Sequence, residues 1–258
     1  MAIAQRLVCV ITLGVALSAA LPLRASAQQN IGSAVGAHND VSRELAGSRG
    51  PIAEGDQVFH NEIVRTGVES TAKLVFLDST ALAVGPISRV VLDRFVYDPT
   101  PSSQSMAVNL GKGIFRFTTG GLDKSAYSIT TPMAAIGVRG TVLDIGVDAR
   151  RTRVTLVEGA ALVCPRRKGE AFEQEARDCA KGHSAPGRHC DCVTLDHEGQ
   201  TATVTASSSG PRASPTGPTV QFASLCGADP SMCSGAGTQF AGGAPLSSGW
   251  GAGSLCGR

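Results

Sequence analysis

The chain has 258 residues, of which 42% are hydrophobic and 17% are charged, with 23 Lys and Arg residues against 21 Asp and Glu residues. Arg6 and Arg24 lie in an N-terminal segment, and without them the basic and acidic residues are equal in number. This balance excludes the strongly positive surface that nucleic-acid-binding proteins use, so no nucleic-acid partner is expected.

The N-terminal segment predicts export. A weakly positive start ending at Arg6 is followed by an apolar run over residues 7–23 and by Ala-Ser-Ala at residues 25–27, which is the order of features in a cleaved secretory signal. A retained membrane helix would need about 20 apolar residues, and Pro22 interrupts this run. We expect cleavage near Ala27, localisation in the periplasm or outside the cell, and no membrane insertion of the mature chain.

A hydrophobic pattern typical of strands begins after a small, polar lead-in over residues 28–50. In Ala72–Leu77 successive side chains fall on opposite faces, as in a β-strand. Similar runs, separated by Gly, Pro, Asp or Ser, cover residues 80–84, 88–97, 141–147, 152–157, 160–163 and 201–205. Glu158–Gly159 has the composition of a hairpin turn. The pattern predicts one all-β domain over residues 51–205, a β-sandwich of the jelly-roll kind or, as the alternative, a β-solenoid.

Two segments interrupt or follow this pattern. Residues 164–192 are rich in cysteine and predict an insertion between strands, with a short helix over residues 170–177. Residues 206–258 are rich in Gly, Ser, Ala and Pro, and so few large apolar side chains cannot offset the entropy of ordering the segment. We expect this C-terminal tail to be mostly disordered.

The most distinctive string is Ser-Ile-Thr-Thr-Pro-Met-Ala-Ala-Ile-Gly-Val-Arg-Gly-Thr at residues 128–141. Pro132 forces the preceding residue into an extended backbone, while Gly137 and Gly140 allow conformations that a side chain forbids. Arg139 has two interpretations: its guanidinium ties neighbouring turns together, or it holds an anionic ligand or a partner carboxylate. The residues assigned to this structural or binding motif are Thr131, Pro132, Gly137, Val138, Arg139, Gly140 and Thr141.

This string resembles the signature of the FecR domain family, in which an extended Thr-Pro segment leads to Val-Arg-Gly-Thr and a hydrophobic strand. Further segments are similar to the family in the same order, at residues 54–56, 63–67, 70–79, 113–117 and 154–159. Signalling members of the family join a periplasmic FecR domain to a cytoplasmic anti-sigma segment through one membrane helix. Because this sequence has a cleavable signal in their place, direct control of a sigma factor is not expected.

The resemblance implies an exported recognition module. We expect it to bind or scaffold an envelope protein, a glycan or peptidoglycan without catalysis, because the sequence has no nucleophile elbow, phosphate loop or His-Glu-x-x-His helix. Asp144 and Asp148 lie near Arg150 on one predicted strand face, a spacing more typical of a solvated face than of a catalytic pair. No cofactor is expected.

Seven of the eight cysteines follow the N-terminal segment, and in an oxidising compartment they predict disulfides. The expected pairs are Cys164 with Cys192, Cys179 with Cys190, and Cys226 with Cys233. Cys256 would then be free to form an intermolecular bridge in a dimer. The alternative is zinc binding or thiol-redox chemistry by the cysteines of the insertion together with His183, His189 and His197. Their spacing fits no standard zinc site, so no metal is expected.

Overall fold

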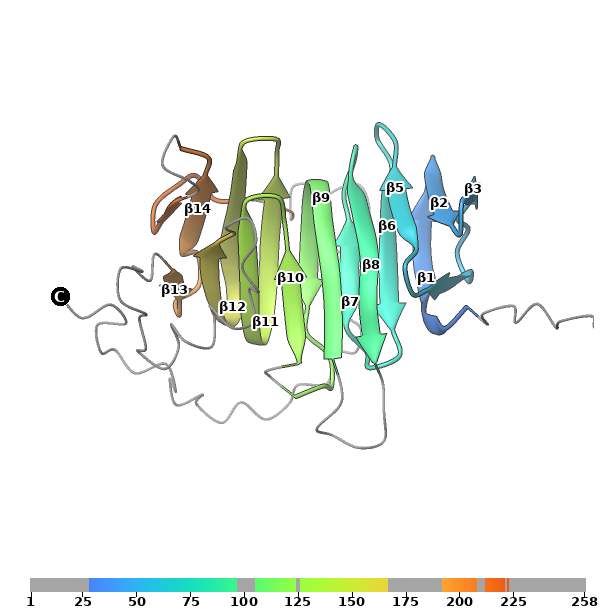
Figure 1. Ribbon diagram of the computed structural model, residues 1–258, viewed down its shortest axis with the longest axis horizontal. Coiled ribbons are helices and arrows are strands. Elements are labelled where there is room, and N and C mark those ends of the chain that lie inside the picture. Colours follow the sequence, from blue (N-terminus) through green and yellow to red (C-terminus); the bar gives the residue numbers. More distant parts are fainter. Residues whose placement is uncertain are drawn as a thin grey trace, which may run out of the picture.

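The computed structural model describes residues 28–96, 105–123, 126–166, 192–207, 212–220 and 222. Within these residues the fold is all-β, as the sequence predicts, and the strands stand side by side along the long axis of the molecule (Figure 1). The described part contains no helix that is long and apolar enough to cross a membrane. The predicted signal peptide, which ends at Ala27, lies outside the described residues.

The strands form one open sheet that is folded into two layers. Three long strands belong to both layers: β9 (Ser105–Thr118), β11 (Ala134–Val147) and β12 (Arg151–Pro165). The first layer also contains β4 (Gln57–Phe59), β1 (Asn30–His38), β6 (Thr71–Phe76), β7 (Ala81–Val84), β14 (Thr201–Thr205) and β15 (Arg212–Ser214). The second layer also contains β3 (Ser48–Pro51), β2 (Val41–Leu45), β5 (Ile63–Thr66), β8 (Arg89–Val96), β10 (Tyr127–Thr130) and β13 (Val193–Leu195).

Each long strand passes from one layer to the other at a glycine. β9 pairs with β8 and β10 over its first part and with β7 and β11 over its second part, and β11 and β12 change partners in the same way. The bends coincide with Gly113, Gly140 and Gly159, whose φ angles are 122°, 59° and 87°. Residues with a Cβ rarely adopt such angles, so the glycines allow the hydrogen bonding to continue around the molecule.

One of these bends corrects an expectation from the sequence. Glu158–Gly159 is not a hairpin turn, because β12 continues without a break from Arg151 to Pro165. The same composition suits both structures, since each needs a residue with positive φ. The pairing of β12 with both parts of β11 selects the bend.

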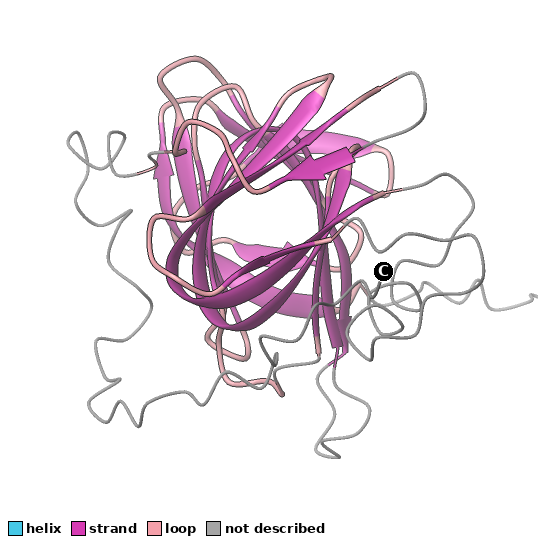
Figure 2. Cartoon of the chain, turned by 90° about the vertical axis from the view of Figure 1, so that its left-hand side faces the viewer, coloured by secondary structure: helices cyan, strands magenta, loops and turns pink. Residues whose placement is uncertain are grey.

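The two layers face each other across the interior, as Figure 2 shows in a view along the long axis. The chain advances along this axis from β1, β2 and β3 at one end to β13 and β14 at the other (Figure 1). The two layers are the feature expected of a sandwich, and the steady advance of the chain is the feature expected of a solenoid. The all-β class is confirmed, and the described strands belong to a single open sheet.

The interior between the layers is apolar. On β11, Ala134, Ile136 and Val138 point into it, and on β9 the large rings of Phe115 and Phe117 do the same. Because side chains alternate between the two faces of a strand, the residues between these positions form the outer faces of the layers. The candidate functional groups must therefore be sought on the outer faces and on the turns.

The lead-in predicted at residues 28–50 is part of the sheet. It forms β1, β2 and β3, and Ile31, Ala34 and Val41 belong to the core. The strand pattern of β1 is hard to recognise because its residues are small and because the register with β6 shifts between Ala34 and Gly36. The β domain therefore begins at Asn30 rather than at residue 51.

The start of the predicted disordered tail is also ordered. β15 pairs with β14, and Phe222 is fully buried. The prediction of disorder for residues 206–258 is therefore wrong for this first part. Residues 223–258 lie outside the described residues, as does the helix expected at residues 170–177.

Candidate functional site

The turns of the molecule line up along two opposite edges. The first edge consists of the turns at residues 39–40, 67–70, 85–88, 112–113, 131–133 and 148–150. The second edge consists of the turns and bends at residues 77–80, 119–123, 140–141, 158–159 and 196–200. Hydrogen bonds join successive turns, such as Ile87 N to Gly67 O at 3.0 Å on the first edge and Thr119 N to Thr141 O at 3.0 Å on the second.

The structure divides the predicted motif between these two edges. Residues 131–132 lie on the first edge, in the hairpin between β10 and β11. Residues 139–141 lie on the second edge, where β11 bends, and residues 137–138 belong to the strand segment between them. The motif residues therefore do not converge on one site.

Thr131 organises the hairpin on the first edge. Its Oγ1 accepts a hydrogen bond from Ala134 N at 2.8 Å and lies 2.8 Å from Thr152 Oγ1 on the neighbouring strand. Its carbonyl oxygen accepts from the guanidinium of Arg166 at 3.2 Å. Thr131 is fully buried, whereas Pro132 is exposed. Thr131 therefore has a structural role.

Thr141 organises the bend on the second edge. Its Oγ1 accepts from Arg139 N at 2.8 Å and donates to Ala160 O at 2.7 Å, while its N–H donates to Thr119 Oγ1 at 2.8 Å. These bonds satisfy the backbone groups that the bend at Gly140 takes out of the regular ladder. The Arg-Gly-Thr part of the motif thus fixes the path of the strand between the layers.

Arg139 lies on the outer face of the second layer, because it alternates with the inward-facing Val138. Its guanidinium makes no hydrogen bond or ion pair with any residue that the structure describes. Within that part of the chain, the interpretation in which this side chain ties turns together is not supported. Arg139 as a whole residue is half-exposed.

A buried polar cluster holds the second edge together next to this bend. Tyr127 OH donates to Asp78 Oδ2 at 2.9 Å and accepts from Leu122 N at 3.0 Å, while Thr80 Oγ1 donates to Asp78 Oδ2 at 2.5 Å. Asp78, Thr80 and Tyr127 are all buried. Burial raises the pKa of Tyr127 to about 12, and the neighbouring Asp78 acts in the same direction.

Replacing Tyr127 with phenylalanine is expected to lower the free energy of unfolding by about 2 kcal/mol, because Leu122 N and Asp78 lose a buried partner. The raised pKa of Tyr127 favours the neutral phenol in the fold, so its contribution is complete below pH 10 and is lost as the pH rises toward 12. Urea unfolding from pH 7 to 11.5 should show that the difference in free energy of unfolding between the wild-type protein and Tyr127→Phe becomes smaller as the pH rises. A difference in free energy of unfolding that stays constant above pH 10 would contradict the stabilising role of the neutral Tyr127 phenol.

The outer face of the first layer contains a buried ion pair. Arg116 Nε and Nη2 donate to Asp144 Oδ1 and Oδ2 at 2.7 and 2.9 Å, because β9 and β11 place these residues directly opposite each other. The prediction that Asp144 lies on a solvated face with Asp148 is wrong for Asp144, which is 3% exposed. Asp148 is partly exposed and pairs with Arg151 at 3.0 Å.

The C-terminal segment covers this ion pair. Phe222 N donates to Asp144 Oδ2 at 3.1 Å, and the Arg116 guanidinium carbon lies 5.6 Å from the centre of the Phe222 ring. Val220 N donates to Thr155 Oγ1 at 2.8 Å. Arg116 and Asp144 are therefore structural partners of the segment that follows β15. The Phe-Arg-Phe alternation at residues 115–117 was a signal that position 116 faces outward.

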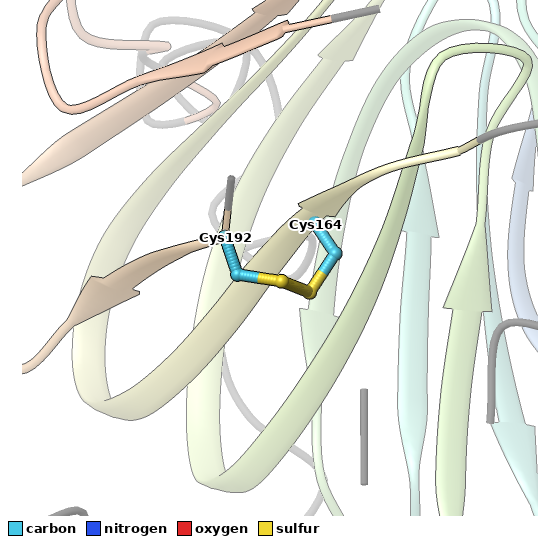
Figure 3. Close-up of a disulfide and its surroundings, with 2 residues drawn as sticks. All are labelled: Cys164 and Cys192. Carbon is cyan, nitrogen blue, oxygen red and sulfur yellow. A yellow bond between two sulfur atoms is a disulfide. The ribbon is translucent and has the colours of Figure 1, made fainter. Parts of the chain in front are cut away.

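One disulfide lies within the described residues, between Cys164 and Cys192 (Figure 3). It joins the end of β12 to the start of β13, which is the pairing that the sequence predicts. Because Cys192 is bonded to Cys164, it is not available as one half of a Cys190-x-Cys192 dithiol or as a zinc ligand. Of the other predicted disulfide residues, Cys179, Cys190, Cys226 and Cys233 lie outside the described residues, as does Cys256.

The described residues contain no cluster of three His, Cys, Asp or Glu side chains that could hold a metal ion. His197 is described and lies beside Asp196, with 2.6 Å between His197 Nδ1 and Asp196 Oδ1. His183 and His189 lie outside the described residues. Metal binding by the insertion stays a prediction, because Cys179, His183, His189 and Cys190 lie outside the described residues.

Comparisons with known proteins agree with the sequence motif. Residues 62–162 match the family described as FecR protein. Two crystal structures of a candidate anti-sigma factor from Parabacteroides distasonis ATCC 8503 are similar to the chain, each with 11% sequence identity and a TM-score of 0.40. In both, the similarity covers 63% of this chain and 62% of the other, a likeness too distant to carry a functional argument. No curated protein matches the chain.

Proposed function

The chain contains a FecR domain, and on this premise we propose that it is a non-enzymatic binding or scaffolding module of the cell envelope. The partner is an envelope protein, a glycan or peptidoglycan, and the protein acts without direct control of a sigma factor. The predicted signal peptide supports export to the periplasm or beyond. The Cys164–Cys192 disulfide supports the same location, because such bonds persist in oxidising compartments.

The observation that carries this proposal is the presentation of Arg139. Most polar side chains of the motif are used by the fold: Thr131 bonds the hairpin and Thr141 bonds the bend. Arg139 is the exception, since the residue is half-exposed and its guanidinium has no partner among the described residues. The hydrogen-bonded bend holds the backbone beneath it, so the side chain is presented from a fixed position.

A guanidinium presented in this way is suited to a carboxylate. Its planar set of donors can form two parallel, charge-assisted hydrogen bonds with one carboxylate group. The exposed acids Asp123, Glu158 and Asp196 lie on the same edge of the molecule, and their charge disfavours a purely anionic ligand there. We therefore propose that Arg139 binds an isolated carboxylate of a partner whose surroundings are neutral or positive, such as a peptide or a protein surface.

The experiment is site-specific photo-crosslinking in envelope extracts. A photo-crosslinking amino acid at Glu158, which is exposed on the strand next to Arg139, should capture a partner, whereas the same group at Lys112 on the first edge should not capture it. Adding Arg139→Gln to the Glu158-labelled chain should weaken capture by about tenfold, since a charge-assisted hydrogen bond contributes roughly 1.5–3 kcal/mol. The melting temperature should stay within about 2 °C. Equal capture by both labels, or capture that Arg139→Gln leaves unchanged, would overturn the proposal.

A further inference from the structure

We infer that the first edge is a docking surface for an anionic lipid bilayer. Two large apolar side chains protrude from adjacent turns of this edge: Val68, which is 72% exposed, and Ile87, which is 53% exposed. Ile87 N donates to Gly67 O at 3.0 Å, so the two turns are held side by side. Exposed apolar side chains grouped in this way mark surfaces that are covered in use.

The backbone of Ile87 points to a role for its exposed side chain. Its φ angle is 52°, in the left-handed region that β-branched residues very rarely adopt. The turn is fixed on both sides, because Thr66 Oγ1 donates to Gly85 O at 2.6 Å and accepts from Ser88 N at 3.0 Å. The fold thus tolerates strain at a position where Gly or Asn would be relaxed, and the result is a rigid apolar tip.

Basic side chains accompany these apolar tips. The exposed cations of the first edge are Lys112, Arg150, Arg151 and Arg166, and the half-exposed Arg89 lies directly opposite Lys112 in the sheet. The acids of the same edge are Asp40, Glu69 and Asp148, of which Asp148 is paired with Arg151. The described part of this edge is therefore net positive.

The second edge has the opposite charge. In the turns that define it, the exposed acids are Asp123, Glu158, Asp196 and Glu198, and Arg139 lies beside the bend at residues 140–141. Such a distribution orients the molecule in the field of a negatively charged surface, with the first edge toward it and the second edge away. The apolar tips would then enter the headgroup region while the cations meet lipid phosphates.

A bilayer fits this surface because the turns form a row along one side of an elongated molecule rather than a pocket (Figure 1). A row of tips can contact an extended surface simultaneously, and each contact can be weak. The orientation leaves Arg139 on the opposite edge, away from the lipid and open to a partner. Lipid docking and partner binding therefore use opposite edges, so either one can be disproved without affecting the other.

The test is co-sedimentation of the protein with lipid vesicles. The chain from Gln28 onward is used, because it is the mature chain expected after cleavage near Ala27. Vesicles of phosphatidylcholine with 30% phosphatidylglycerol are compared with pure phosphatidylcholine at about 0.05 M and 0.5 M salt. We expect binding to the anionic vesicles alone, with most of it lost at high salt.

Variants separate docking from folding. Lys112→Glu combined with Arg150→Glu should weaken binding by about tenfold or more. Ile87→Asn should also weaken binding without lowering stability, because asparagine accepts the left-handed backbone. The matched control is Leu77→Asn on the second edge, since Leu77 is 54% exposed and should not touch the lipid. Glu69→Gln should strengthen binding, because it removes an acid from the first edge.

Three results would contradict docking of the first edge on an anionic bilayer. Absence of the wild-type protein from sedimented anionic vesicles at low salt would exclude lipid docking. Equal losses of binding for Ile87→Asn and Leu77→Asn would show that the first edge has no special role. Salt-insensitive binding to vesicles of pure phosphatidylcholine would contradict the role of the basic side chains in attracting the anionic lipid.

Discussion

Replacing Gly159 with alanine is expected to lower the free energy of unfolding by about 3 kcal/mol or more. A Cβ at this position would collide with the carbonyl oxygen of Gly140 and lie 2.9 Å from the Cα of Thr141. Both obstacles are backbone atoms of the neighbouring strand, so neither can move aside as a flexible side chain would. The φ angle of 87° adds roughly 1–2 kcal/mol for a residue with a Cβ, and the overpacking adds a similar amount.

Two other glycines of the same region serve as matched controls. Gly137→Ala should change stability by less than about 1 kcal/mol, because a Cβ there meets no atom within 4 Å and the backbone has no positive φ. Gly140→Ala should fall between the two, because its φ is 59° although a Cβ has open space. Unfolding curves in guanidinium chloride should show the largest loss of stability for Gly159→Ala, a smaller loss for Gly140→Ala and the smallest for Gly137→Ala. Equal effects at Gly159 and Gly137 would disprove the close contact between the two bends.

The bends mark the limit of what the sequence could predict about the fold. Alternation of apolar residues correctly indicated an all-β domain and strands such as the one predicted at residues 72–77, which is β6 (Thr71–Phe76). A glycine within such a pattern is compatible with a turn or with a bend, because both need the same backbone angle. Only the pairing of β12 with two different parts of β11 distinguishes them at Gly159, and that pairing is a property of the whole sheet.

The N-terminal strands were missed for a different reason. β1 contains mostly small residues, so its apolar pattern is weak, yet Gly32 packs directly against the backbone of Val75 and Phe76. A larger residue at this position would not fit, so the feature that weakens the pattern is the one that permits the packing. Local propensity cannot show such a contact between residues more than 40 positions apart.

The candidate site was predictable in part. The constrained turn at Thr131 and the bend at Gly140 follow from the residue types, and the structure contains both. The exposure of the Arg139 guanidinium does not follow, since an arginine between glycines could equally have bonded a neighbouring turn. The Arg116–Asp144 pair was missed because strand register alone brings together two residues 28 positions apart.

Replacing Asp144 with asparagine is expected to lower the free energy of unfolding by about 3 kcal/mol. The carboxylate accepts both hydrogen bonds of the Arg116 guanidinium, whose side chain is 13% exposed. Asparagine has nearly the same shape but no charge, so the guanidinium would be left without its counter-ion in a largely buried place. Thermal and urea unfolding measure the effect directly. Asp148→Asn is the control, because that ion pair is exposed and should contribute less than about 1 kcal/mol.

The same substitution tests whether the ion pair anchors the C-terminal segment. Phe222 N donates to Asp144, and its ring lies over Arg116, so loosening the pair should release Phe222 before the sheet unfolds. Hydrogen exchange near residues 220–222 should increase in Asp144→Asn under conditions in which the amides of β9 and β11 remain protected. Replacing Arg116 and Asp144 together with leucine should recover much of the lost stability, because no charge is then left unpaired. Exchange that rises equally in the segment and in the sheet would mean that Phe222 is held by the fold as a whole rather than by this pair.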